Sequence, residues 1–149
     1  MTDAMSPLTM TIRLVLAVAL GGLLGYEREI GHKTAGLRTH MLVCLGSAVF
    51  VLAALEAGAG AGDLTRVIQG IATGIGFVGA GAILKLTDPG HAQVKGLTTA
   101  SSVWLTAAVG LAAGAGRIWL AVLTTALGLI ILVVVLRLED HFRQDTPRG

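Results

Sequence analysis

Residues 36–49 read GLRTHMLVCLGSAV, and residues 96–109 read GLTTASSVWLTAAV. Aligned without gaps, the two stretches are identical at seven of fourteen positions, and both place Gly-Leu-x-Thr directly before an apolar run. Upstream of each lies a glycine-rich apolar segment, GGLLG (21–25) or IGFVG (75–79), followed by a polar loop. The sequence therefore predicts a parallel internal repeat, in which the first two membrane spans correspond to the next two and share their orientation.

The composition indicates a membrane protein. Of the 149 residues, 54% are apolar and only 13% are charged, and the mean hydropathy is +0.78. Because lipid offers the backbone no hydrogen-bond partners, the spans are expected to be helical. We predict an all-α polytopic membrane bundle of about five transmembrane helices, with the third, rich in small residues, buried inside it. The expected spans are Leu8–Gly25, Met41–Leu55, Val67–Leu84, Thr98–Gly114 and Ile118–Leu136.

The distribution of lysine and arginine predicts the orientation of the bundle, because cytoplasmic loops carry an excess of these residues. Eight of the eleven basic residues fall on one side of the five expected spans. We therefore expect an amino terminus outside the cell, a transmembrane domain over residues 1–136 and a short cytoplasmic tail over residues 137–149. The first ten residues do not resemble a secretory signal, so the first span is expected to be retained.

The two Gly-Leu-x-Thr turns are the first candidate for a functional site. Thr39 and Thr99 have side chains able to accept a hydrogen bond from a backbone N–H and so to cap a helix start. Two capped helix starts at one membrane face could form a pocket that attracts anions, reinforced by Arg38. Ordinary caps and turns explain the pattern equally well. The candidate polar or ion site comprises Glu27, Arg28, Arg38, Thr39, His40, Thr98 and Thr99.

Glu27 is of particular interest because a carboxylate that directly follows an apolar run should find a cationic partner or a helix start. An interfacial salt bridge that only orients the first loop is an equal alternative. A cation site is a weaker interpretation, since the neighbouring Arg28, Lys33 and Arg38 would repel a divalent ion. The sequence therefore does not identify a metal that this site would bind. The side chains with oxygen or nitrogen ligands on this side are Glu27, Glu29, His32, His40, Asp88 and His91.

Glycines at GxxxG spacing on three spans predict close helix packing, because they let two backbones approach. The run GIGFVGAGA (74–82) contains more small residues than one contact face needs, which predicts either helix crossings on more than one side or a second protomer, and hence a homodimer. The expected packing glycines are Gly21, Gly25, Gly70, Gly74, Gly76, Gly79, Gly81, Gly110 and Gly114.

Several function classes find no support in the sequence. It contains no HExxH, nucleophile elbow or P-loop, so an enzyme is the least favoured reading and no cofactor is expected. The basic residues are divided between two membrane faces and form no continuous stripe, which argues against nucleic-acid binding.

Five segments in order closely resemble the MgtC/SapB family of bacterial inner-membrane proteins, and the likeness covers about four fifths of the chain. They are GYERE (25–29), AGLRTHMLVCLGSAVF (35–50), DLTR (63–66), GIGFVGAGAILK (74–85) and VKGLTTASSVWLTAAVGLAAGAG (94–116). The chain looks closer to the short SapB type, without the soluble cytoplasmic domain of MgtC itself. The resemblance implies a polytopic inner-membrane protein without established enzymatic activity, from a family linked to virulence.

Two functions remain open at this point. The first is a non-enzymatic regulator that binds another membrane complex and serves ion or membrane-energy homeostasis or adaptation to low magnesium. The resemblance implies the F-type ATP synthase as a possible partner, because the best-known members restrain that enzyme. The second is a small ion or solute transporter or channel with a polar site near the cytoplasmic face.

Overall fold

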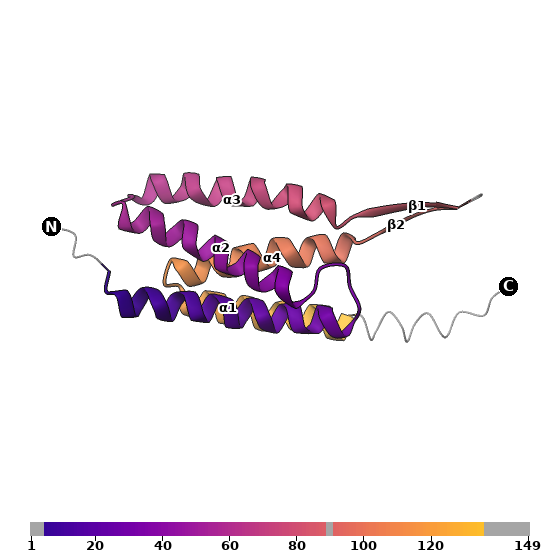
Figure 1. Ribbon diagram of the computed structural model, residues 1–149, viewed down its shortest axis with the longest axis horizontal. Coiled ribbons are helices and arrows are strands. Elements are labelled where there is room, and N and C mark those ends of the chain that lie inside the picture. The colour runs from indigo at the N-terminus through magenta and orange to yellow at the C-terminus, as the bar shows by residue number, and fades with distance from the viewer. Residues whose placement is uncertain (1–4, 89–90, 136–149) are drawn as a thin grey trace.

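The protein is described by a computed structural model that covers residues 5–88 and 91–135, without the side chains of residues 84–93 and Val135. Five helices and one β-hairpin follow one another along this part of the chain (Figure 1). The helices are α1 (Pro7–Ile30), α2 (Leu37–Glu56), α3 (Ala61–Gly81), α4 (Leu97–Gly114) and α5 (Ile118–Ile130), which continues as a π-helical turn (Ile131–Val135). The hairpin consists of β1 (Leu84–Asp88) and β2 (His91–Lys95).

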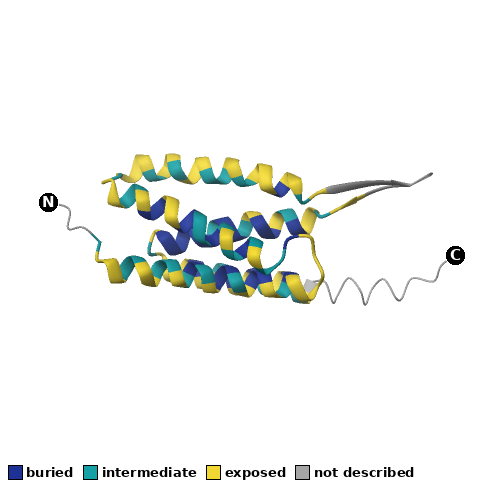
Figure 2. Cartoon of the chain, in the orientation of Figure 1, coloured by how far each residue is buried: buried dark blue, intermediate teal, exposed yellow. Residues whose placement is uncertain are grey.

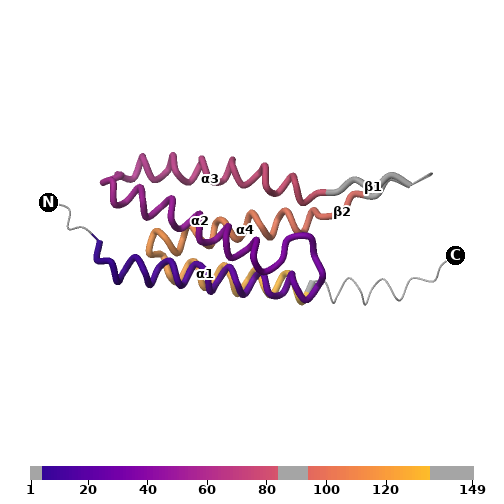
Figure 3. The backbone as a smooth tube through the Cα atoms, viewed as in Figure 1, coloured from indigo at the N-terminus to yellow at the C-terminus, as the bar shows by residue number. Residues whose placement is uncertain are grey.

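The helices form an antiparallel bundle with α4 at its centre. Helix α4 contacts each of the other four helices. Along the backbone, α1, α3 and α5 run in one direction and α2 and α4 run in the other (Figure 3). The α1–α2 loop and the hairpin that joins α3 to α4 therefore lie at the same end of the bundle. The predicted all-α bundle of five helices is confirmed, and its two helix pairs run in the same direction.

The lengths and compositions of the helices suit a membrane. Among the described residues, α1, α2 and α4 are long and apolar enough to cross a bilayer, and Ile118–Val134 is a shorter apolar helix. That α3 and α5 also cross the membrane stays a prediction. The expected tail at 137–149 lies outside the described residues.

Glycine pairs on α1 and on α4 both pack directly against α2. A Cβ atom at Gly21 would lie 2.6 Å from the Cβ of Cys44, and one at Gly25 would lie 2.8 Å from the Cα of Leu37. On α4, a Cβ at Gly110 would meet the carbonyl oxygen of Cys44, and one at Gly114 would lie 2.7 Å from that of Ala48. Two of the three predicted GxxxG pairs thus bring backbones into direct contact with α2.

The expectation that the third span is buried is wrong. Gly79 is the only buried residue of α3, and most of this helix is exposed (Figure 2). Gly79 makes ordinary contact with Ala100, whereas a Cβ added at Gly70, Gly74, Gly76 or Gly81 would have no atom within 4 Å in the described chain. Small residues give α3 little side-chain surface to bury against α2 and α4. The parts of α3 that carry these four glycines therefore have no close partner within the described chain.

The β-hairpin was not predicted. Leu84 pairs with Lys95 and Asp88 pairs with His91 in an antiparallel register that extends away from the bundle (Figure 1). The sequence LKLTD alternates apolar and polar residues, which is typical of a strand, but it directly follows the third apolar run. Reading Leu84 as the end of that span obscured the strand.

The different surroundings of the glycines predict different effects of the same substitution. Gly110→Ala should lower the free energy of unfolding by about 1–3 kcal/mol, because the new methyl group overlaps the backbone of α2. Gly74→Ala is the matched control, and it should leave stability unchanged or slightly raised because alanine favours helix. Thermal unfolding of the two purified variants in one detergent measures this difference. Equal destabilisation by both would contradict the contacts of α2 described above.

Candidate functional site

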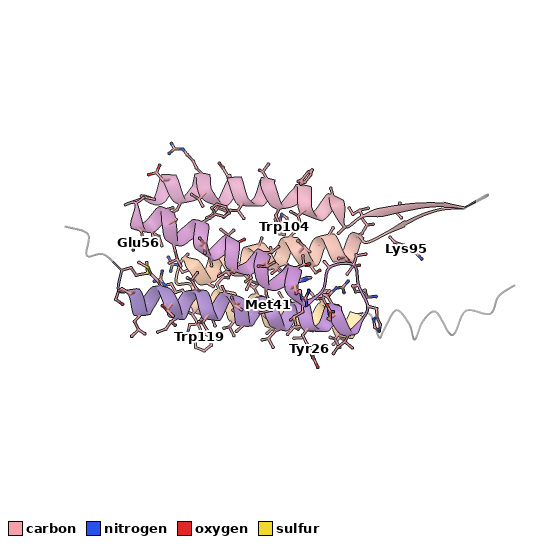
Figure 4. All side chains as sticks on the ribbon, viewed as in Figure 1. Tyr26, Met41, Glu56, Lys95, Trp104 and Trp119 are labelled. Atoms are coloured by element: carbon pink, nitrogen blue, oxygen red, sulfur yellow. The ribbon has the colours of Figure 1, made fainter. Side chains whose placement is uncertain are left out.

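A polar cavity lies at the end of the bundle that carries both Gly-Leu-x-Thr turns, and residues of the second turn line it. Its volume is about 350 Å³. It lies between the end of α1, the end of the hairpin and the start of α4, and the labelled Lys95 marks this end of the molecule (Figure 4). The residues that line it are Arg28, His32, Lys33, Thr34, Ala82, Lys95, Gly96, Thr98 and Thr99.

Arg28 is the charged residue buried at this cavity. It lies in the last turn of α1, and its side chain is 3% exposed. Its Nη2 donates a hydrogen bond to Thr99 Oγ1 at 3.2 Å, and its Nη1 lies 3.5 Å from Glu27 Oε2. Its Nε has no hydrogen-bond partner among the described residues. A buried guanidinium normally has all its donors satisfied, so Arg28 is only partly compensated.

Hydrogen bonds continue from Thr99 to α2. The hydroxyl of Ser102 donates to the Thr99 carbonyl at 2.8 Å and lies 3.1 Å from Nε2 of the fully buried His40. The other ring nitrogen, Nδ1, is 2.9 Å from the Gly36 carbonyl and must carry a proton, because a carbonyl only accepts. A continuous polar chain therefore links α1, α4 and α2 inside the bundle.

The prediction that Thr39 and Thr99 cap the two helix starts is wrong. The N-caps are Gly36 for α2 and Gly96 for α4, and neither makes a side-chain cap bond. Each threonine lies three residues further on, inside the first turn, and Thr99 there accepts its bond from Arg28. At α2 the carboxylate of Glu29 takes over the cap, because its Oε2 accepts the Leu37 N–H at 3.0 Å.

The two turns also differ in backbone conformation. Gly36 is extended, whereas Gly96 has φ +97° and ψ 0°, a left-handed conformation that glycine adopts without strain. A Cβ at Gly96 would meet the carbonyl oxygen of Ala82, so the two ends of the hairpin segment touch there. The sequence repeat therefore does not produce two equivalent turns.

Helix α1 ends in a Schellman motif with an unusual residue. The Lys33 N–H bonds to the Arg28 carbonyl, and the His32 N–H bonds to the Glu29 carbonyl. Helices α2 and α4 end with the same pair of bonds, and there the left-handed position is held by Gly58 and Gly116. In α1 it is held by His32, with φ 50°. A histidine that lines the cavity thus occupies a position where glycine is favoured.

The remaining predicted site residues are more dispersed. Arg38 is exposed and does not line the cavity, Thr39 is half-buried, and Thr98 is exposed at the cavity wall. The side chains of Asp88 and His91 lie outside the described residues. No group of three or more His, Cys, Asp or Glu side chains that could hold a metal ion occurs among those described.

Sequence reasoning missed Ser102, Lys95 and the role of Glu29. A signal for Ser102 was present, because Thr99, Ser102 and Thr106 recur at helical spacing and all three are buried on one side of α4. Lys95 and Glu29 gave no comparable signal, since a lysine or a glutamate in a polar loop is usually solvated.

Comparison with known proteins agrees with the resemblance seen in the sequence. A model of the MgtC family matches residues 14–141. The chain belongs to the MgtC family. No solved structure matches it.

Three relatives of this MgtC-family chain differ in length. SrpB of Synechococcus elongatus is 40% identical over 141 residues, which cover 89% of this chain and 78% of SrpB. YhiD of Escherichia coli strain K12, whose name assigns it provisionally to magnesium transport, is 38% identical, with 83% of this chain and 59% of YhiD covered. MgtC of Brucella abortus is 48% identical, with 68% and 41% covered. The chain thus spans about half the length of YhiD and MgtC.

Because Thr99 belongs to the polar chain and Thr98 does not, replacing each by valine should change the free energy of unfolding by different amounts. Thr99→Val keeps the shape of the side chain but removes the hydroxyl that accepts from Arg28. We expect the free energy of unfolding to fall by about 1–3 kcal/mol, because a buried charged donor loses its partner. Thr98→Val, at the exposed neighbouring position, should change it by less than about 0.5 kcal/mol. Thermal unfolding in detergent measures both, and equal effects would show that the Arg28–Thr99 bond does not stabilise the bundle.

Proposed function

We propose that this MgtC-family chain is a non-enzymatic protein of the bacterial inner membrane that acts by binding a transmembrane helix of another membrane protein. The observation that carries the proposal is the glycine face of α3, which has no partner in the described chain. This face forms one wall of an apolar groove of about 530 Å³ between α2 and α3, which Gly70, Gly74 and their apolar neighbours line on the α3 side.

The cost of glycine in a helix supports this proposal. Each glycine in a helix interior destabilises it by about 0.5–1 kcal/mol relative to alanine, and contact with lipid tails does not require glycine. In α1 and α4 the same GxxxG spacing brings backbones into contact with α2. The pair Gly70 and Gly74 has the same spacing and an open face. A helix from another membrane protein would give it the close packing that the other two pairs already have.

A role in adaptation to low magnesium fits this mode of action better than magnesium binding does. Mg²⁺ prefers carboxylate and water ligands. The cavity at the end of the bundle is instead lined by Arg28, Lys33 and Lys95, and the described residues that line it include no carboxylate. The name of YhiD suggests a role in magnesium transport. In this chain, a role in magnesium adaptation is therefore exerted through a protein partner and not through bound Mg²⁺. The F-type ATP synthase, which the family resemblance implies, is the first partner to test.

Photo-crosslinking in native membranes tests the proposal. We expect a photoreactive residue at Phe77, which is 86% exposed on α3, to yield an adduct with a second membrane protein. Ile131, which is 59% exposed after α5, is the matched control and should yield mainly lipid adducts. Mass spectrometry of the adducts identifies the partner. In a Gly74→Leu variant the bulky side chain should reduce the Phe77 adduct about tenfold or more, because the helices can no longer approach.

Recovery of only lipid adducts from Phe77, or of products containing only this chain, would contradict binding to another protein. An adduct that forms equally well from Ile131 would contradict the assignment to α3.

A small transporter is the second candidate, favoured by the buried polar chain from Arg28 through Thr99 and Ser102 to His40. Buried polar groups at membrane depth often mark an ion pathway. Vesicles that contain the purified chain should then move protons or other ions faster than empty vesicles, and His40→Phe should abolish the difference. Flux equal to that of empty vesicles would reject this candidate.

A further inference from the structure

The amino-terminal ends of α2 and α4, which lie at the cavity end of the bundle, differ in whether a side chain offsets their positive dipole. At α2 the Glu29 carboxylate accepts the first N–H of the helix and opposes its positive end. At α4 none of the described side chains caps the start, and the first backbone hydrogen bond reaches Ala100. The N–H groups of Leu97, Thr98 and Thr99 precede that bond, and among the described residues no side chain accepts from them as Glu29 does at α2. The positive end of an 18-residue helix thus opens at the cavity.

Arg28 adds a positive charge at this same place. At the opposite end of α4, Arg13 from α1 donates to the Gly114 carbonyl at 2.9 Å, where the helix dipole favours a cation. Arg28 comes from the same helix α1 but meets α4 at its positive end, where the dipole opposes a cation. Its guanidinium is buried at the cavity wall with Nε unpartnered among the described residues. The Glu27 carboxylate oxygen Oε2 lies 3.5 Å from Nη1 of Arg28.

The exposed rim of the cavity is also basic. Lys33 and Lys95 line it from different elements, one after the end of α1 and one before the start of α4. His32 lines it from a left-handed backbone position that is unfavourable for a non-glycine residue. Thr98 and Thr99 supply hydroxyl groups. The cavity therefore combines an open helix N-terminus with three cationic side chains and hydroxyl donors.

We infer that this cavity binds a phosphate group, held by the open N–H groups at the start of α4, by Arg28 and by the Lys33 and Lys95 side chains. A phosphate suits these donors because its oxygens accept several hydrogen bonds at once and its charge offsets the buried guanidinium and the helix end. The group can belong to free inorganic phosphate or to an anionic lipid headgroup. This inference does not rest on the helix-binding role proposed for α3.

Binding of inorganic phosphate to the purified chain in detergent tests the first source. Equilibrium dialysis with radiolabelled phosphate at constant ionic strength measures the dissociation constant. Lys95→Gln should weaken binding about fivefold, because it removes one cationic contact. Arg38→Gln is the matched control, since it removes one exposed basic residue at the same end that does not line the cavity, and it should change binding by less than about twofold.

His32→Gly provides a variant that should not impair folding. Glycine relieves the left-handed strain, so thermal stability should rise, while phosphate binding should fall because a donor is lost. The reverse change in the same motif, Gly58→His on α2, should lower stability and leave phosphate binding unchanged, since nothing lies near a Cβ at Gly58.

Lipid nanodiscs test the second source. They contain phosphatidylcholine with or without phosphatidylglycerol, and native mass spectrometry counts the lipids retained by each variant. Saturable phosphate binding that Lys95→Gln weakens and Arg38→Gln does not supports a free phosphate. Retention of phosphatidylglycerol with the same dependence, without phosphate binding in detergent, supports a headgroup. Absence of both kinds of binding, or equal losses in the two variants, overturns the inference.

Discussion

The close contact of α2 with two glycine pairs is the constraint on which the rest of the structure depends. Gly21 and Gly25 on α1 and Gly110 and Gly114 on α4 bring both backbones against α2, so that the three helices form a single core. At this separation side chains from different helices meet directly. The side chain of Arg28 on α1 bonds directly to Thr99 on α4, and that of His40 on α2 bonds directly to Ser102 on α4.

This arrangement explains how an arginine can be buried between apolar helices. Removing a charge from water costs several kcal/mol, and a buried ion pair offsets this cost only when its geometry is good. Here the pair with Glu27 is long, and Thr99 supplies the one direct hydrogen bond to the guanidinium. The protein thus retains a charged group that its own described side chains do not fully satisfy. Such groups more often serve function than stability.

The sequence predicted the parts of the fold that depend on composition and repetition. The Gly-Leu-x-Thr repeat predicted two helix pairs with a common direction, and the Gly21/Gly25 and Gly110/Gly114 spacings predicted close packing. It could not show which glycine pair remains open. Gly70 and Gly74 have the same spacing as the other two pairs, and only the three-dimensional arrangement shows that no helix of the described chain covers them.

The candidate site was less predictable for a similar physical reason. Identical motifs led to different caps, because the partner of the first turn, Glu29, comes from the preceding helix and has no counterpart among the described side chains at the second turn. The hairpin between α3 and α4 also changes the second turn, since closing it places Gly96 against the Ala82 carbonyl and sets its left-handed backbone. Thr39 and Thr99 therefore serve different purposes despite their matching positions.

The position of α3 relates its open face to the cavity at the end of the bundle. Helix α3 contacts α4 at Ala100, the residue after Thr99, and its chain continues through the hairpin to Lys95 at the cavity wall. Ala100 lies next to Thr99, which lines the cavity, so the packing of α3 on α4 adjoins the cavity wall. Two ligands affect each other's affinity reciprocally when each favours the same packing of α3 on α4. The exposed face of α3 and the cationic cavity at the start of α4 are therefore connected through this helix contact.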